Sequence, residues 1–173
     1  MNNANGEPGT SEENNAKSGN ASPDPLSEAN VHVAECDMGK GVFAGQVFLA
    51  DSIIGEITGD VIDDPMYGSN YAIDLENGHT LEPSAPFRFV NHSCEPNSEF
   101  TFFTVDVEES DKSGHSLRLV FLSAVQRIAE GEELTIDYNW PAESAIPCRC
   151  LAADCRGWIV AEEELVDVLK PEK

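Results

Sequence analysis

The sequence predicts a mostly β protein with little helix. From Val31 onward, short runs of β-branched and aromatic residues alternate with turns rich in Gly, Asp and Asn, a pattern typical of short strands. Two longer runs, residues 100–107 and 117–122, flank a polar turn at 110–114 and predict a hairpin. Only residues 161–169 space their apolar side chains as a helix does. Strands should therefore build most of the protein.

Turn residues bound the other expected strands, which are shorter. These strands cover residues 31–34, 41–44, 52–62, 71–75 and 134–138. In the expected helix, Leu165, Val168 and Leu169 share one face. Pro171 has no amide hydrogen and crowds the turn before it, so the helix should end near Lys170.

The chain is strongly acidic, with 32 acidic and 10 basic residues and a formal charge of -22. Such a charge opposes direct binding to the phosphate backbone of a nucleic acid. It attracts basic partners instead, such as lysine-containing proteins, and speeds their encounter. The alternative is that the acidity serves solubility alone.

The 173 residues allow one domain with a tail. Residues 1–29 are rich in Asn, Gly, Ser, Glu and Pro and predict a disordered acidic tail. No apolar run approaches the roughly 20 residues of a membrane span. The N-terminus also lacks the basic start and apolar stretch of a secretory signal. These features predict an intracellular protein, in the cytoplasm or the nucleus, without a membrane partner.

Three of the five cysteines, Cys148, Cys150 and Cys155, lie within eight residues. In a reducing compartment this crowding indicates a metal site more than disulfides. Three thiolates can surround one tetrahedral zinc ion but leave its fourth position open. Cys94 and Cys36 are the candidates for that position, ahead of a histidine or water. The competing interpretation is three unrelated structural cysteines.

Two further segments are polar where the surrounding chain is apolar. The first is residues 88–97, Arg-Phe-Val-Asn-His-Ser-Cys-Glu-Pro-Asn. Its Asn, His, Ser and Cys in succession are poor strand formers, and Pro96 bars a regular helix. This run could bind a ligand or simply form a turn. Residues 131–138, Gly-Glu-Glu-Leu-Thr-Ile-Asp-Tyr, are a turn and a short strand ending in Tyr138. Taken alone, Tyr138 is most simply a partly buried packing residue.

Together these segments resemble SET-domain lysine methyltransferases with a post-SET zinc segment. The similarity lies in Asn-His-Ser-Cys-x-Pro-Asn at 91–97, Glu-Leu-x-x-Asp-Tyr at 133–138 and the Cys-x-Cys-x4-Cys ending, in that order. Residues 39–44, 54–62 and 71–75 are similar to earlier parts of the family. The resemblance implies small curled sheets around a pseudoknot, in which the Tyr138 segment threads a loop beside Asn91. It also implies methyl transfer from S-adenosylmethionine to the amine of a protein lysine.

The resemblance also implies a role for individual residues. Those expected to bind the cofactor are Gly39, Lys40, Gly41, Asn91, His92, Tyr138 and Trp158, the last packing on the adenine or in the core. Tyr138 and Tyr71 are the expected catalytic residues, and Tyr71 and Ile136 the expected lining of the substrate channel. Cys94 would join Cys148, Cys150 and Cys155 on one structural zinc ion, leaving Cys36 a spare buried thiol.

The implied organisation is a SET domain over 30–140, a post-SET zinc segment over 141–160 and a C-terminal helix over 161–173. The chain departs from the family pattern at three points. No cysteine-rich segment precedes Val31, the insert at 63–86 is short, and Ile136 stands where the family commonly has Tyr or Phe. Two other functions compete with the enzyme: a catalytically silent SET fold that binds basic peptides, and a purely structural zinc domain.

Overall fold

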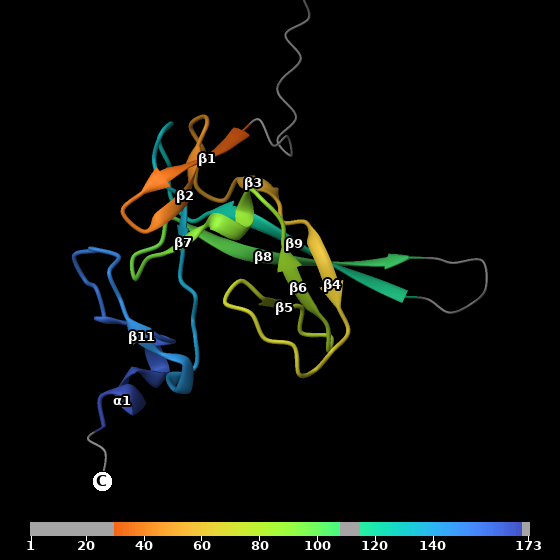
Figure 1. The fold of residues 1–173 in the computed structure, drawn as a ribbon. Coiled ribbons are helices and arrows are strands. Elements are labelled where there is room, and N and C mark those ends of the chain that lie inside the picture. Colours follow the sequence, from red (N-terminus) through yellow and green to blue (C-terminus); the bar gives the residue numbers. More distant parts are fainter. Residues whose placement is uncertain (1–29, 108–114, 171–173) are drawn as a thin grey trace, which may run out of the picture.

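The computed structural model describes residues 30–107 and 115–170. The expected tail (1–29), the hairpin turn (110–114) and the stop at Pro171 lie outside the described residues. The ribbon in Figure 1 consists of small sheets with one short α-helix near the C-terminus. The strands are β1 Val31–Cys36, β2 Gly39–Ala44, β3 Ile53–Glu56, β4 Gly59–Ile62, β5 Ile73–Asp74, β6 Thr80–Pro83, β7 Asn91–His92, β8 Ser98–Val107, β9 His115–Ala124, β10 Thr135–Ile136, β11 Ile146–Pro147 and β12 Trp158–Ile159.

These strands form five sheets in the described chain. Three are pairs (β1-β2, β10-β7 and β11-β12), and two have three strands (β3-β9-β8 and β4-β6-β5). The predicted hairpin is confirmed, because β8 and β9 pair antiparallel from Ser98↔Ala124 outward. In Figure 1 this hairpin extends to the right, away from the C-terminal segment at the lower left.

The run predicted over 52–62 divides between two sheets, since β3 pairs with β9 and β4 with β6. Gly59 opens β4 against Pro83, and a Cβ there would lie 2.0 Å from the carbonyl oxygen of Glu82. Only glycine lets the two backbones approach so closely. Gly59 therefore lets β4 pair closely with β6 in the sheet that carries β5.

Three expected elements are shorter than predicted. Residues 71–75 contribute only Ile73–Asp74, and residues 134–138 only Thr135–Ile136. The C-terminal helix is a 3-10 turn, Glu162–Glu164, followed by one α-turn, Leu165–Val168. Leu169 does not share the packed face, since it is 62% exposed. A single turn can place Leu165 and Val168 on the same face, and the helix ends before Leu169 can join them.

The buried core joins β2, β3 and β9 to the segment around β10. Its fully buried large side chains are Ile54, Leu122, Ile128, Leu134, Val42 and Val120. Burying each such aliphatic side chain contributes about 1.5–3 kcal/mol, so this core fixes the strands that carry the two polar motifs. Among the described residues, no helix has the length and apolar content needed to cross a membrane.

Candidate functional site

The two polar motifs meet in the parallel pair β7-β10, which aligns Thr135 with Asn91 and Ile136 with His92. Asn97 fastens the pair from one side. Its Oδ1 accepts from the Thr135 amide at 2.9 Å, and its Nδ2 donates to the Glu133 carbonyl at 2.8 Å. Asn97 is buried, so these bonds satisfy an amide that would otherwise be costly to bury. Asn97 thus holds the motifs together, a role that the sequence did not reveal.

Asn91 ties the start of strand β2, at Gly39–Gly41, to the second motif. Its Nδ2 donates to the Lys40 carbonyl at 3.0 Å and to Glu133 Oε1 at 2.8 Å. A Cβ on Gly41 would lie 2.4 Å from the same Glu133 oxygen, so glycine is what admits this carboxylate. Gly41 therefore acts through Glu133, while Lys40 supplies a backbone acceptor.

A cleft runs along the turn between β1 and β2, at Asp37 and Met38, and we call it the turn-side cleft. It consists of two adjoining hollows that share Met38 and Asn91. The first is lined by Cys36, Asp37, Met38, Phe43, Asn91, His92, Ser93, Glu133, Thr135, Arg149, Cys150 and Leu151. The second is lined by Met38, Lys40, Tyr71, Arg88, Phe89, Val90, Asn91 and Tyr138. Cys36, expected to be a buried spare thiol, is half-buried in this lining, 3.4 Å from Asn91 Nδ2. Gly39 and Gly41 lie outside both linings.

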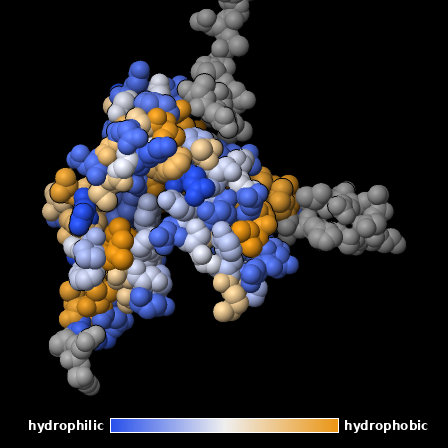
Figure 2. Space-filling model, viewed as in Figure 1, coloured by the Kyte–Doolittle hydropathy of each residue, from blue (hydrophilic) through white to orange (hydrophobic). Residues whose placement is uncertain are grey.

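A second cavity adjoins the cleft, and we call it the aromatic channel. Its lining is Asn70, Tyr71, Ala72, Ile73, Pro83, Phe87, Arg88, Val90, Phe100, Ile136, Tyr138 and Trp140. Figure 2 shows the surface notched between the C-terminal segment and the lobe built by β4, β5 and β6. Tyr71, Arg88, Val90 and Tyr138 line both the channel and the cleft. Tyr138 and Tyr71, expected from the sequence, thus stand in the wall between the two spaces.

Tyr138 is held by its hydroxyl, which donates to the Val90 carbonyl at 2.9 Å. Burial, with smaller contributions from the Tyr71 phenol and the Glu133 carboxylate, raises the pKa of Tyr138 to about 12. The phenol therefore keeps its proton at neutral pH. Because the hydroxyl hydrogen is engaged with the Val90 carbonyl, the lone pairs of the phenol oxygen can accept a hydrogen bond from another group.

Tyr71 is 45% exposed, and the Arg88 guanidinium lies 4.5 Å from its ring centroid. This cation–π contact holds the ring at the mouth of the channel. Ile136 is a buried residue of the same lining. The strand β10 ends at Ile136, so Tyr138 is not on the same strand as expected, yet both side chains face one channel.

Trp140 is a channel residue that the sequence reasoning missed. Its ring lies 5.4 Å from that of Tyr138 and closes the same lining. Extending the alternation of 136 and 138 by one more step would have found it. Trp158, expected beside the cofactor, lies half-buried on β12 opposite Pro147, outside the linings of the cleft and the channel, and its expected role stays a prediction.

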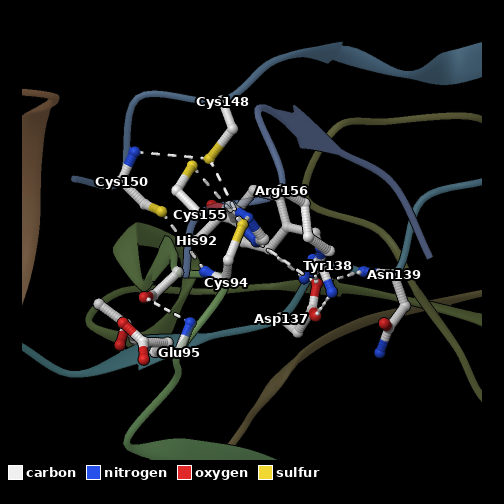
Figure 3. A network of polar contacts seen from close by, with 12 residues as sticks. His92, Cys94, Glu95, Asp137, Tyr138, Asn139, Cys148, Cys150, Cys155 and Arg156 are labelled. Atoms are coloured by element: carbon white, nitrogen blue, oxygen red, sulfur yellow. Dashed lines mark hydrogen bonds and ion pairs between the residues drawn. The ribbon is translucent and has the colours of Figure 1, made fainter. Parts of the chain in front are cut away.

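Four cysteine side chains converge beside the cleft, and one of them, Cys150, lines it (Figure 3). Cys94 Sγ lies 3.8 Å from Cys148 Sγ and 4.0 Å from Cys155 Sγ. Four thiolates, each about 2.3 Å from a tetrahedral zinc ion, stand about 3.8 Å apart, so these distances fit zinc. Burial acts to raise the pKa of Cys150, but amide hydrogen bonds from Cys94 and Ala152 outweigh it and lower that pKa to about 6. At Cys94 and Cys148 burial prevails and raises the pKa, so of these three thiols Cys150 loses its proton first.

His92 also approaches the cluster, since its ring can join Cys94, Cys148 and Cys150 within 4.8 Å. Its hydrogen bonds argue against a ligand role. The Tyr138 amide can only donate, so His92 Nδ1, 3.3 Å away, accepts. Burial lowers the pKa of His92, which keeps the ring neutral and leaves the proton on Nε2. Nε2 then donates to Cys94 Sγ at 3.4 Å, as an outer partner of a metal-ligating thiolate does.

The matched family model is the SET domain, over residues 39–139, and the chain belongs to this family. It is 37% identical over 107 residues to Histone-lysine N-methyltransferase ash1 of Drosophila melanogaster, covering 58% of this chain and 4% of that one. It is 43% identical over 79 residues to Histone-lysine N-methyltransferase Set2 of the same organism, covering 44% and 3%. The chain thus spans a small fraction of these relatives.

Among solved structures, KRYPTONITE in complex with mCHH DNA, H3(1-15) peptide and SAH superposes with a TM-score of 0.60. The two are 26% identical, over 75% of this chain and 29% of that one. The family resemblance and the fold class expected from the sequence are confirmed. The roles expected for single residues and the domain boundaries stay predictions.

Proposed function

We propose that this protein transfers methyl groups from S-adenosylmethionine to the side-chain amine of a lysine in a protein substrate. One observation carries the proposal: Tyr138 stands in the wall shared by the turn-side cleft and the aromatic channel. A transfer between two bound molecules needs such a meeting point. The SET-domain match supports it, as do relatives named for histone-lysine methylation and a similar structure bound to a histone peptide and SAH.

The turn-side cleft is the proposed cofactor site. Asn91 and the backbone of Lys40 would hold the amino-acid end, and the backbone at His92 would face the base, because the imidazole itself points to Cys94. When bound there, S-adenosylmethionine supplies an electrophilic methyl group on a positive sulfur. Glu133, in the same lining, would face this positive charge.

The aromatic channel is the proposed lysine site. A free lysine amine has a pKa of about 10.4, so roughly one in a thousand is neutral at pH 7. Removing the amine from water in this channel disfavours the charged form and lowers that pKa, and the Arg88 guanidinium acts in the same direction. The Tyr138 oxygen would accept a hydrogen bond from the amine and aim its lone pair. Among the described residues of this lining, none is a carboxylate or an imidazole, so the proton should leave to water.

Cys94, Cys148, Cys150 and Cys155 are the proposed ligands of one structural zinc ion. The ion would join the proposed post-SET segment, 141–160, to the motif at Asn91 in the proposed SET domain, 30–140. The acidic chain favours a basic, lysine-containing substrate, with histones the first to test.

The test is incubation with isotope-labelled S-adenosylmethionine and purified core histones, followed by mass spectrometry of the products. Label on lysine is expected with the wild-type chain, and at least tenfold more slowly with Tyr138→Phe. A whole-cell extract serves as the second substrate, since the target need not be a histone. Cofactor binding without transfer to either would refute the enzyme and support the peptide-binding alternative. Zinc without cofactor affinity would leave only a structural zinc domain.

A further inference from the structure

A closed circuit of contacts links the cysteine cluster to Tyr138 (Figure 3). Arg156 directly follows Cys155. Its guanidinium donates two hydrogen bonds to Asp137, from Nη1 to Oδ2 at 2.6 Å and from Nη2 to Oδ1 at 2.8 Å. Asp137 directly precedes Tyr138 in the chain. The path from the cluster to the channel wall therefore contains only two side chains.

His92 provides the return path. Its Nδ1 accepts from the Tyr138 amide at 3.3 Å, and its Nε2 lies 3.4 Å from Cys94 Sγ. Asp137 Oδ1 lies 3.5 Å from the same Nδ1, so the path through Arg156 and Asp137 and the path through His92 are in contact. The backbone at Tyr138 is thus held between two residues, each of which contacts or adjoins a cysteine of the cluster.

The pair between Arg156 and Asp137 is half-buried, with side chains 13% and 17% exposed. A bidentate guanidinium–carboxylate pair fixes orientation as well as distance. Yet Arg156 Nε is buried with no hydrogen-bond partner in the described chain, which is a cost. Buried ion pairs add little net stability compared with apolar packing, so stability alone explains this one poorly.

We propose that the pair of Arg156 and Asp137 positions Tyr138, and that it makes the position of Tyr138 depend on metal in the cysteine cluster. Arg156 is then a positioning residue, acting through Asp137, and touches neither substrate nor cofactor. The inference rests on the proposed zinc site and on the proposed role of Tyr138. A purely structural pair would merely attach residues 148–159 to the domain and leave Tyr138 unchanged when broken.

The test measures hydrogen exchange of the Tyr138 amide by NMR, with and without a zinc chelator. This amide donates to His92, so its exchange reports the geometry in question without cofactor or substrate. In the wild type, chelation is expected to speed exchange at least tenfold. In zinc-loaded Arg156→Met, exchange should already be at least tenfold faster, and chelation should add less than threefold.

Arg118→Met is the matched control, because Arg118 also pairs with a carboxylate, that of Glu76, and also buries an Nε without a hydrogen-bond partner in the described chain. Its Tyr138 exchange should equal that of the wild type in both conditions. Arg156→Lys, which keeps the charge but cannot bind in bidentate fashion, should fall between wild type and Arg156→Met. If Arg156→Met does not fold with zinc, Asp137→Asn takes its place with the same expectation.

Protection of the Tyr138 amide within twofold of wild type in zinc-loaded Arg156→Met, or in its replacement, would overturn the inference. So would a wild-type chain that holds no zinc. Kinetics give a second readout: kcat should fall at least tenfold in Arg156→Met while KM for the cofactor changes less than threefold. If the exchange results hold but the wild type transfers no methyl group, the coupling stands and the proposed function fails.

Discussion

Replacing Tyr138 by Phe removes one oxygen from the wall between the turn-side cleft and the aromatic channel. The hydroxyl donates to the Val90 carbonyl, so one neutral hydrogen bond is lost, with a net value of about 0.5–1.5 kcal/mol. The carbonyl left behind faces a channel that water can enter, which holds the total to about 1–2 kcal/mol. A domain with about 5–15 kcal/mol of stability stays folded after that loss. Thermal denaturation should shift by only about 2–8 °C.

Methyl transfer should fall much further, because the same oxygen is the proposed acceptor that aims the amine. We expect turnover to drop at least tenfold, which corresponds to about 1.4 kcal/mol of barrier. Cofactor affinity should stay within about twofold, since the hydroxyl lies at the edge of the cleft. Calorimetry, thermal denaturation and a methylation assay on one preparation separate the three effects.

The pH profile gives an internal check. The pKa of Tyr138, raised to about 12, keeps the phenol protonated through any assay range. The rate should therefore rise between about pH 7 and 10 with the neutral fraction of the substrate amine. Tyr138→Phe should be slower but keep the same profile. Near-normal turnover of this variant, or a wild-type inflection that it lacks, would refute the role given to Tyr138.

The remaining predictions concern the metal, the product and the charge. Metal analysis should find one zinc per chain, less in Cys150→Ser and unchanged in Cys36→Ser; full zinc in Cys150→Ser would contradict the ligand set. Ile136→Tyr should shift the product toward monomethyl-lysine, because the wild-type isoleucine leaves room for a second or third methyl group. The control Ile136→Leu should leave the product unchanged. A wild-type product that stops at one methyl group with enzyme in excess would refute this. The specificity constant for a lysine-rich substrate should fall between 0.1 and 1 M salt, as screening shortens from about 10 to 3 Å; a constant value would leave the acidity to solubility.

Local patterns in the sequence predicted much of this fold. The apolar runs of β8 and β9 gave the hairpin, and glycine turns gave the short strands at 31–44. Strand lengths were less predictable, since β5 and β10 are only two residues long. Their neighbours leave the ladder to line the channel, and nothing in local periodicity marks that point. The length of the C-terminal helix was also predicted wrongly, because that length depends on which side chains pack against the rest of the protein.

The candidate site divides in the same way. Close spacing marked Cys148, Cys150 and Cys155, and motifs marked Asn91 and Tyr138. The residues that were missed act through partners far along the chain: Asn97 bonds across 38 positions to Thr135, and Arg156 reaches back 19 to Asp137. Such pairs have no local signature, because each side chain alone is an ordinary polar residue. They become visible only once β7 and β10 lie side by side.

Substitutions of the residues that hold the site in place should differ in effect from substitutions of the motif residues. The motif residues offer atoms to bound molecules, whereas Asn97, Arg156 and Glu133 hold those atoms in place through buried or half-buried polar bonds. Removing one partner of such a bond leaves the other unsatisfied, at about 1–3 kcal/mol each, more when charged. A replacement that keeps the hydrogen bond should therefore cost little stability. A replacement of the same shape that loses the bond should cost much more. For Asn97, which donates and accepts through one amide, Asp would lose the donor to the Glu133 carbonyl and bury a charge there, and should be more damaging than its similar shape suggests.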